Sequence, residues 1–206
     1  VFADIPPQSP DGLDATPKSG SRINLTWNDL SSNESRFEIE RRKEGGGVYS
    51  QIAHVAANET SYNDTGLSEK STYYYRVRAI NSAGNSGYSN EIDATTYLAR
   101  PTNLSAIDAS TSKIYLSWTD NSSYEAGFEI ERKRGTGASF SQIAILTTGQ
   151  TGYSDTGLNE ETTYYYRVRA YDTGEQSDYS NEASATTDAE SSGGGGGCII
   201  STADSG

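Results

Sequence analysis

The chain has 206 residues, a net charge of −12 at pH 7 and 33% hydrophobic residues. The length favours two domains of ordinary size, and 15 tyrosines with no methionine indicate a soluble, β-rich protein with thin cores, which is typical of exported proteins. The acidic balance excludes nucleic acid and disfavours an anionic membrane surface as partners, because phosphate groups are bound by clustered Lys and Arg.

Residues 1–9 are interpreted as an N-terminal extension. Because the chain begins at Val1 and contains no methionine, we expect a processed or trimmed product, and the composition predicts an extracellular or cell-surface location. No apolar run approaches the roughly 18 residues that a membrane-spanning helix needs, so we expect no membrane span in this chain.

The rest of the chain consists largely of two copies of one sequence unit. Displacing the sequence against itself by 91 residues brings Trp27 onto Trp118, and the eight residues of Thr72–Ala79 onto an identical Thr163–Ala170. The repeat divides the chain into an extension, a first copy, a linker, a second copy and a tail: residues 1–9, 10–96, 97–100, 101–187 and 188–206. The four-residue linker contains two apolar side chains, so we expect a short, packed and stiff joint.

Apolar residues alternate with polar ones inside each copy. Ile23, Leu25 and Trp27 point to one face of a predicted strand, while Asn24 and Thr26 point to the other. Such segments recur at short spacing, with Gly-, Asn- and Ser-rich turns between them and no helical periodicity. The pattern predicts an all-β protein of two antiparallel sandwiches.

Several motifs resemble the fibronectin type III family in the form common in bacterial exported proteins. They are Trp27, "FEIERR" at Phe37–Arg42, "SYNDTGL" at Ser61–Leu67 and "TYYYRVRAINSAGNSGYSN" at Thr72–Asn90. The resemblance implies an immunoglobulin-like β-sandwich in each copy. It implies strands near Leu13 and at Ile23–Trp27, Arg36–Arg42, Ser50–Val55, Ser61–Asn63, Thr72–Asn81 and Tyr88–Thr95, with counterparts 91 residues later.

The same resemblance gives structural roles to several apolar and aromatic residues. Tyr73 and Tyr164 occupy the tyrosine-corner position of the family, six residues after Leu67 and Leu158, where the ring is buried and its hydroxyl bonds to the backbone. The predicted structural residues are Trp27, Trp118, Tyr73, Tyr164, Leu67 and Leu158.

Paired carboxylates in the third strand raise the question of glycoside hydrolysis, which uses two acids. Strand parity instead places them on the outward face, opposite arginines of a neighbouring strand. We predict an exposed charge ladder in which each pair contributes about 0.2–1 kcal/mol. Its members are Glu38, Glu40, Arg76 and Arg78 in the first copy, and Glu129, Glu131, Arg167 and Arg169 in the second.

Other catalytic and metal-binding patterns are missing from the sequence. The single histidine, His54, corresponds to Ile145 in the second copy, so we interpret it as a structural or surface residue. One histidine and one cysteine cannot form a zinc site, and the sequence contains no calcium loop or phosphate-binding loop. We therefore expect no enzyme activity, no metal and no cofactor.

Outward-pointing aromatic residues leave glycan binding open. Tyr74 and Tyr165 lie on the outward face of a predicted strand, and Tyr124 lies in a loop of the second copy. Sugars stack on such rings, although strands also favour tyrosine for packing along the sheet. Cell-surface glycans are therefore one class of expected partner, beside protein partners or self-association.

The tail from Ser191 to Gly206 differs from both copies. Five glycines predict a flexible spacer, and the uncharged segment containing Cys198, Ile199 and Ile200 is able to pair with a sheet edge. The segment also resembles a C-terminal sorting segment of bacterial surface proteins, in which Cys198 would be a processing or attachment point. Attachment or assembly is therefore predicted at Cys198, Ile199 and Ile200.

The sequence is compatible with two functions. The first is a non-enzymatic extracellular structural or adhesive protein, displayed on a bacterial surface or polymerised into a filament through the tail. The alternative is a pair of spacer or carbohydrate-binding modules belonging to an enzyme that acts on polysaccharides.

Overall fold

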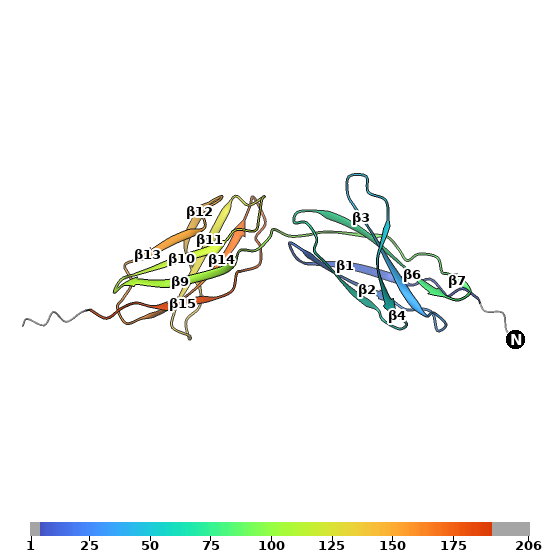
Figure 1. Cartoon of the computed structure of the whole chain (residues 1–206), viewed down its shortest axis with the longest axis horizontal. Helices are drawn as coiled ribbons and strands as arrows, with labels where there is room; N and C mark the ends of the chain where they lie inside the picture. The colour runs from blue at the N-terminus through green and yellow to red at the C-terminus, as the bar shows by residue number, and fades with distance from the viewer. Residues whose placement is uncertain (1–4, 191–206) are drawn as a thin grey trace, which may run out of the picture.

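The computed structural model describes residues 5–190, which form two β-sandwiches arranged end to end along the long axis of the molecule (Figure 1). The predicted attachment residues Cys198, Ile199 and Ile200 lie outside the described residues. Residues 5–190 contain no helix with the length and apolar character that a membrane span requires.

The first module contains eight strands in two antiparallel sheets. One sheet has the order β1-β2-β5, and in the other β4, β3 and β6 are neighbours, with β7 and β8 both paired to β6. The strands are β1 (Asp11–Ser19), β2 (Arg22–Asn28), β3 (Arg36–Lys43), β4 (Ser50–Ala56), β5 (Ser61–Thr65), β6 (Thr72–Asn81), β7 (Gly84–Asn85) and β8 (Ile92–Thr95).

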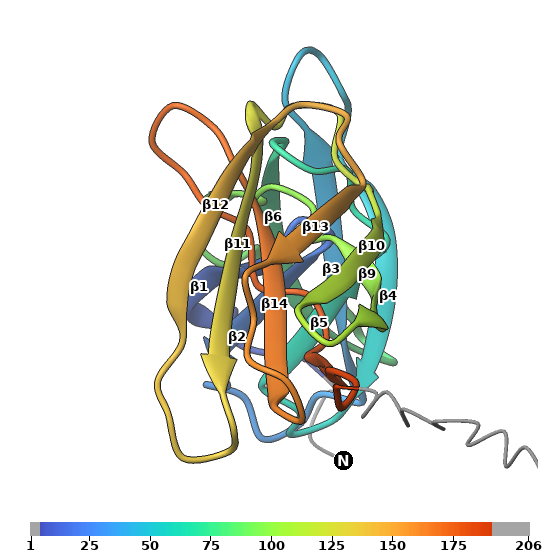
Figure 2. The ribbon, with the colours of Figure 1, turned by 90° about the vertical axis from the view of Figure 1, so that its left-hand side faces the viewer.

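The second module repeats this topology with sheets β9-β10-β13 and β12-β11-β14-β15, except that the bridge between Tyr171 and Gln176 replaces the pairing of β7. Its strands are β9 (Thr102–Ser110), β10 (Lys113–Thr119), β11 (Gly127–Arg134), β12 (Ser141–Thr147), β13 (Gly152–Thr156), β14 (Thr163–Tyr171) and β15 (Ala183–Thr186). Figure 2 looks nearly along the long axis, with the second module in front of the first. The prediction of an all-β fold with two antiparallel sandwiches is confirmed.

The last strand of the first copy differs from the prediction. We expected it to begin at Tyr88, but regular pairing begins only at Ile92. Upstream of that point the hydroxyls of Ser86 and Ser89 accept hydrogen bonds from the N–H groups of β6 at Ala79 and Val77, at 2.9 and 3.1 Å. Because side chains replace backbone carbonyls as acceptors there, the segment follows β6 without forming a regular ladder.

Each module has one core between its two sheets, formed by the inward positions of the alternating strands. In the first module Trp27 packs against Phe37 with ring centres 5.7 Å apart, and in the second Trp118 packs against Phe128 at 5.6 Å. These rings are buried with the aliphatic residues of β2, β3 and β6 and their counterparts. Burial of these apolar side chains supplies most of the driving force for folding each module.

Each module contains a charged cluster built around a buried aspartate and a partly exposed arginine. Asp64 of β5 accepts hydrogen bonds from Arg41 of β3 at 2.8 Å and from the hydroxyl of Tyr75 of β6 at 2.9 Å. The cluster therefore joins the two sheets of the sandwich. The second module repeats it with Arg132, Asp155 and Tyr166.

Candidate functional site

The loop between β5 and β6 carries the residues that contact the second module, and the tyrosine-corner residue holds this loop in place. The Tyr73 hydroxyl accepts a hydrogen bond from the N–H of Ser68 at 2.9 Å, and Leu67 is buried beside it. Thr96 closes the loop from the other side, because its hydroxyl donates to the Ser68 carbonyl at 2.7 Å. The equivalent Tyr164 hydroxyl accepts from the N–H of Asn159 at 3.0 Å in the second module.

Glu69, held on this loop, joins the first module, the linker and the second module. Its Oε2 accepts hydrogen bonds from the N–H of Ala99 in the linker at 2.8 Å and from the hydroxyl of Ser122 at 2.9 Å. Its Oε1 accepts from the N–H of Ser123 at 2.7 Å. Hydrogen bonds to an ionised carboxylate are among the stronger ones in proteins, so this one side chain fixes three segments together.

Lys70 forms the second contact across the joint. Its Nζ lies 3.0 Å from Asp172 Oδ2 and 2.7 Å from Glu175 Oε2, both in the loop after β14. The hydrogen bonds from Lys70 to Glu175 and Asp172 raise the pKa of the lysine, and the same contact lowers the pKa of Asp172. Both charged forms are therefore favoured in the joint. We call the following the joint residues: Glu69, Lys70, Ser122, Ser123, Asp172 and Glu175.

The linker packs tightly against the first module. Leu98 is 1% exposed, and Gly20 lies so close to it that a Cβ at Gly20 would be 2.9 Å from the Leu98 carbonyl carbon and 2.8 Å from Ala99. Only glycine therefore fits this position without movement of the backbone. Such packing restricts the linker far more than a Gly/Ser-rich sequence would.

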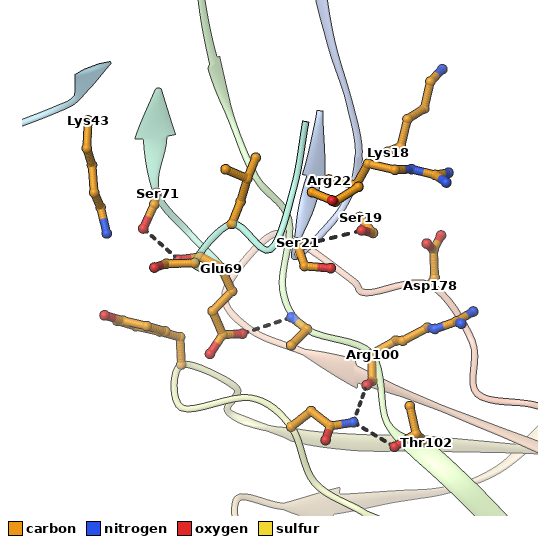
Figure 3. Close-up of a pocket in the computed structure, with 17 residues that line it drawn as sticks. Lys18, Ser19, Ser21, Arg22, Lys43, Glu69, Ser71, Arg100, Thr102 and Asp178 are labelled. Atoms are coloured by element: carbon orange, nitrogen blue, oxygen red, sulfur yellow. Dashed lines mark hydrogen bonds between the residues drawn. The ribbon is translucent and has the colours of Figure 1, made fainter. Parts of the chain in front are cut away.

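A cleft of about 920 Å³ lies on the side of the joint and is lined by both modules (Figure 3). Lys18, Arg22 and Arg100 line it and form no ion pair within residues 5–190, and Figure 3 places all three on the side of Asp178. Tyr124, also in the lining, is 61% exposed. The cleft is therefore polar and carries a local excess of positive charge on an acidic chain.

The residues of the charge ladder are paired as strand parity requires, but they are not exposed. Glu38 lies opposite Arg78, and Glu40 lies opposite Arg76 with a hydrogen bond of 2.8 Å. Glu38 is only 6% exposed and Glu40 only 8%, so the expectation of an exposed ladder is wrong. In the second module Glu129 pairs with Arg169 at 2.7 Å, and Glu131 with Arg167 at 2.8 Å.

Aromatic residues explain this burial. Tyr88 folds over the ladder, with its hydroxyl 2.8 Å from Glu40 and its ring centre 3.8 Å from the Arg76 guanidinium. Burial alone would raise the pKa of Glu40, but the hydrogen bonds from Arg76 and Tyr88 and the charges of the two arginines lower it. Tyr179 covers the second ladder in the same way. The four carboxylates are therefore engaged in structural contacts.

The histidine and the outward-pointing tyrosines of the sequence analysis each have a neighbouring side chain. The His54 ring lies 2.9 Å from the Gln51 side chain, and both residues are at exposed positions of β4. The guanidinium of Arg42 lies 3.6 Å from the ring centre of Tyr74, and the Lys133 ammonium lies 5.1 Å from that of Tyr165. The face of Tyr74 under Arg42 is therefore not free to stack on a sugar.

Within residues 5–190, no three His, Cys, Asp or Glu side chains are grouped in a way that would hold a metal ion.

Sequence reasoning missed the joint residues. Their types are ordinary for loops, and their contacts depend on the relative placement of two modules. One signal was present, since Glu69 recurs as Glu160 while Lys70 is replaced by Glu161, a reversal of charge at the module boundary.

Comparison with known proteins gives consistent matches along both modules. The model of the "Fibronectin type III domain" matches residues 6–95 and 99–186. Exoglucanase B of Cellulomonas fimi is 32% identical over 200 residues, which cover 89% of this chain and 17% of the exoglucanase. Chitinase A1 of Niallia circulans is 29% identical over 197 residues, covering 89% of this chain and 26% of the chitinase.

The fold is shared with a solved structure at lower identity. A two-domain fibronectin type III segment of chicken tenascin aligns with a TM-score of 0.50 and 17% identity, covering 87% of this chain and all of that segment. The chain spans only a minor part of the two bacterial enzymes that it matches. On the match of the family model to both modules, the chain belongs to the fibronectin type III family.

Proposed function

We propose that this chain is a non-catalytic, stiff two-module spacer of an extracellular protein that acts on polysaccharides. The observation that carries the proposal is the joint, in which one carboxylate binds both modules and the linker. The names of the bacterial relatives, an exoglucanase and a chitinase, support the polysaccharide setting, in which the matched part is a minor share of each protein.

The contacts of the joint favour one orientation of the modules over free reorientation. Hydrogen bonds to charged groups contribute about 1.5–3 kcal/mol each, and less where water reaches them. Glu69 accepts three, of which two are partly buried and the one from Ser123 is exposed. The Lys70 pairs contribute less, because water and salt screen ion pairs at the surface. A spacer of this kind sets both the distance and the direction between the segments at its ends.

The non-catalytic part of the proposal rests on how the carboxylates are used. A glycosidase needs one carboxyl group as acid and another as base or nucleophile. Here Glu38 and Glu40 are both buried and paired with arginines, and Tyr88 also bonds to Glu40, so neither carboxylate is available to a substrate. Export, surface attachment and a role for Cys198 stay predictions from the sequence.

Residual dipolar couplings test the stiffness of the joint. In the native chain we expect both modules to report one alignment tensor, because they tumble together. The double variant Glu69→Ala/Lys70→Ala removes both contacts, so the two modules should report tensors of different magnitude and the interdomain order should fall.

The matched control is Glu160→Ala, which removes the equivalent carboxylate from the second module and leaves the joint intact. It should retain one common tensor. Independent reorientation of the modules in the native chain would refute the spacer function proposed for it.

A further inference from the structure

The far end of the second module repeats half of the joint. Glu160 corresponds to Glu69 in the duplicated sequence, and its Oε2 accepts a hydrogen bond from the N–H of Glu190 at 2.9 Å. Glu69 accepts from Ala99 in the same way at 2.8 Å. The Glu160 carboxylate has no other hydrogen bond within residues 5–190, whereas Glu69 receives two more from the next module.

The surrounding loop has the same backbone form at both ends. Glu161 has a φ of 46°, close to the 47° of Lys70, and its N–H donates to the Asp188 carbonyl at 3.3 Å. The Thr187 hydroxyl donates to the Asn159 carbonyl at 2.6 Å and so closes this loop as Thr96 closes the first. The acceptor half of a joint is therefore preformed at this end.

The first module carries the matching donor half. Ser31 and Ser32 in the loop after β2 correspond to Ser122 and Ser123, the two donors to Glu69. The N–H of Ser31 donates to Asp29 Oδ1 at 2.9 Å, and the N–H of Ser122 donates to its own aspartate at 3.0 Å. The two loops thus share one turn, and the exposed N–H of Ser32 has no hydrogen bond within residues 5–190. The Ser31 hydroxyl donates to Asn33 Oδ1 at 2.9 Å, so it has to turn away from Asn33 to bind a carboxylate as Ser122 does.

We propose that copies of this chain associate head to tail, with Glu160 of one copy bound by the Ser31 hydroxyl and the Ser32 N–H of a second copy. The contact reuses the geometry of the internal joint and continues the end-to-end arrangement of the modules. Because each copy has one acceptor end and one donor end, association extends into a linear chain of copies.

Three replacements make this contact weaker than the internal joint. Glu161 stands where Lys70 forms its ion pairs, and Asn81 stands where Asp172 receives one of them. Ala189 is exposed where Leu98 is buried. Association should therefore appear only at high protein concentration, and the internal joint shows how to strengthen it.

Sedimentation velocity over a concentration series, on the full chain under reducing conditions, tests the proposal. Glu160→Ala should weaken association at least tenfold. Asp93→Ala is the matched control, since it removes the charge of an exposed carboxylate in the middle of β8, and it should leave association unchanged.

The converse experiment restores the missing ion pair. Glu161→Lys combined with Asn81→Asp should strengthen association about tenfold, whereas Asp93→Lys with Asn81→Asp, which has the same net charge, should not. Lysine fits position 161 because Lys70 occupies the same backbone conformation.

The proposal is overturned if the native chain stays monomeric at millimolar concentration. It is equally overturned if Glu160→Ala associates like the native chain, as it would if the tail mediated the contact. Neither result bears on the spacer function, because the dipolar couplings measure the two modules within one chain.

Discussion

Asp64 shows how much one buried charge contributes to each module. It is 3% exposed, and both of its oxygens are bound by Arg41, with Tyr75 as a third contact. Burial and the nearby Asp64 charge raise the pKa of Tyr75 far above its ordinary value, so the phenol stays a donor. Since the three residues come from β3, β5 and β6, the cluster fixes how the two sheets are placed relative to each other.

We predict that Asp64→Asn lowers the free energy of unfolding of the first module by about 3 kcal/mol, because Arg41 loses its partner charge inside the sandwich. Differential scanning calorimetry of the full chain should show one transition moved down by about 10 °C or more. Asp155→Asn should move the other transition instead. A change below about 1 kcal/mol would show that the cluster is not a stabilising contact.

At the scale of the element, the start of β11 differs from the start of β3. Gly127 of β11 corresponds to Arg36 of β3, and a Cβ built at Gly127 would lie 1.8 Å from the carbonyl oxygen of Leu146 in β12. The backbones of β11 and β12 therefore approach each other more closely there than a side chain permits. The exposed Arg36 shows that the first module has no such restriction.

Gly127→Ala is expected to destabilise the second module by about 1–3 kcal/mol, the usual cost of forcing an extra methyl group into a packed position. Its control is Arg36→Ala, which should change the first module by no more than about 0.5 kcal/mol because the side chain is exposed. Chemical denaturation followed by a probe in each module measures both. An unchanged second module would mean that β12 shifts at no cost.

Local pattern predicts much of each sandwich, because period-two alternation fixes which residues face the core. It also places Glu40 and Arg76 on one face, but it does not reveal that Tyr88 covers them, since Tyr88 precedes the regular part of the last strand. The cluster around Asp64 was missed because its members belong to two different sheets, so strand parity within one sheet does not bring them together. Glu69 and Lys70 were missed because their partners are set by the placement of one module on the other.

At the scale of the whole molecule, the joint makes the chain one elongated body (Figure 1). The polar cleft lies beside this joint (Figure 3). The ionic contacts of the joint make this arrangement dependent on pH. The pKa of Asp172 is lowered from 3.8, so its contribution is present above that pH and is lost as the pH falls through the lowered value. The pKa of Lys70 is raised from 10.5, so its contribution is present below that pH and is lost as the pH rises through the raised value.

We therefore predict one common orientation of the modules between about pH 5 and pH 9, and increased interdomain motion in acid below the range in which Asp172 is ionised. Dipolar couplings at several pH values measure this orientation. In Lys70→Ala the relative orientation of the modules should change less with pH than it does in the native chain. An orientation that changes between about pH 5 and pH 9 would contradict the assignment of these contacts.

The near-identity of the two modules has a consequence for how the chain folds. β6 and β14 share eight consecutive residues, and the partner strands β3 and β11 share "FEIER". If β14 paired with β3, the Glu–Arg pairs would still form in the native register. The free energies of pairing β3 with β6 and with β14 then differ only in the entropy of loop closure. The exchanged pairing closes a loop roughly three times as long, which costs about 1 kcal/mol more. Correct folding of this chain therefore requires that the strands of each module pair with one another before they meet the unpaired strands of the other module.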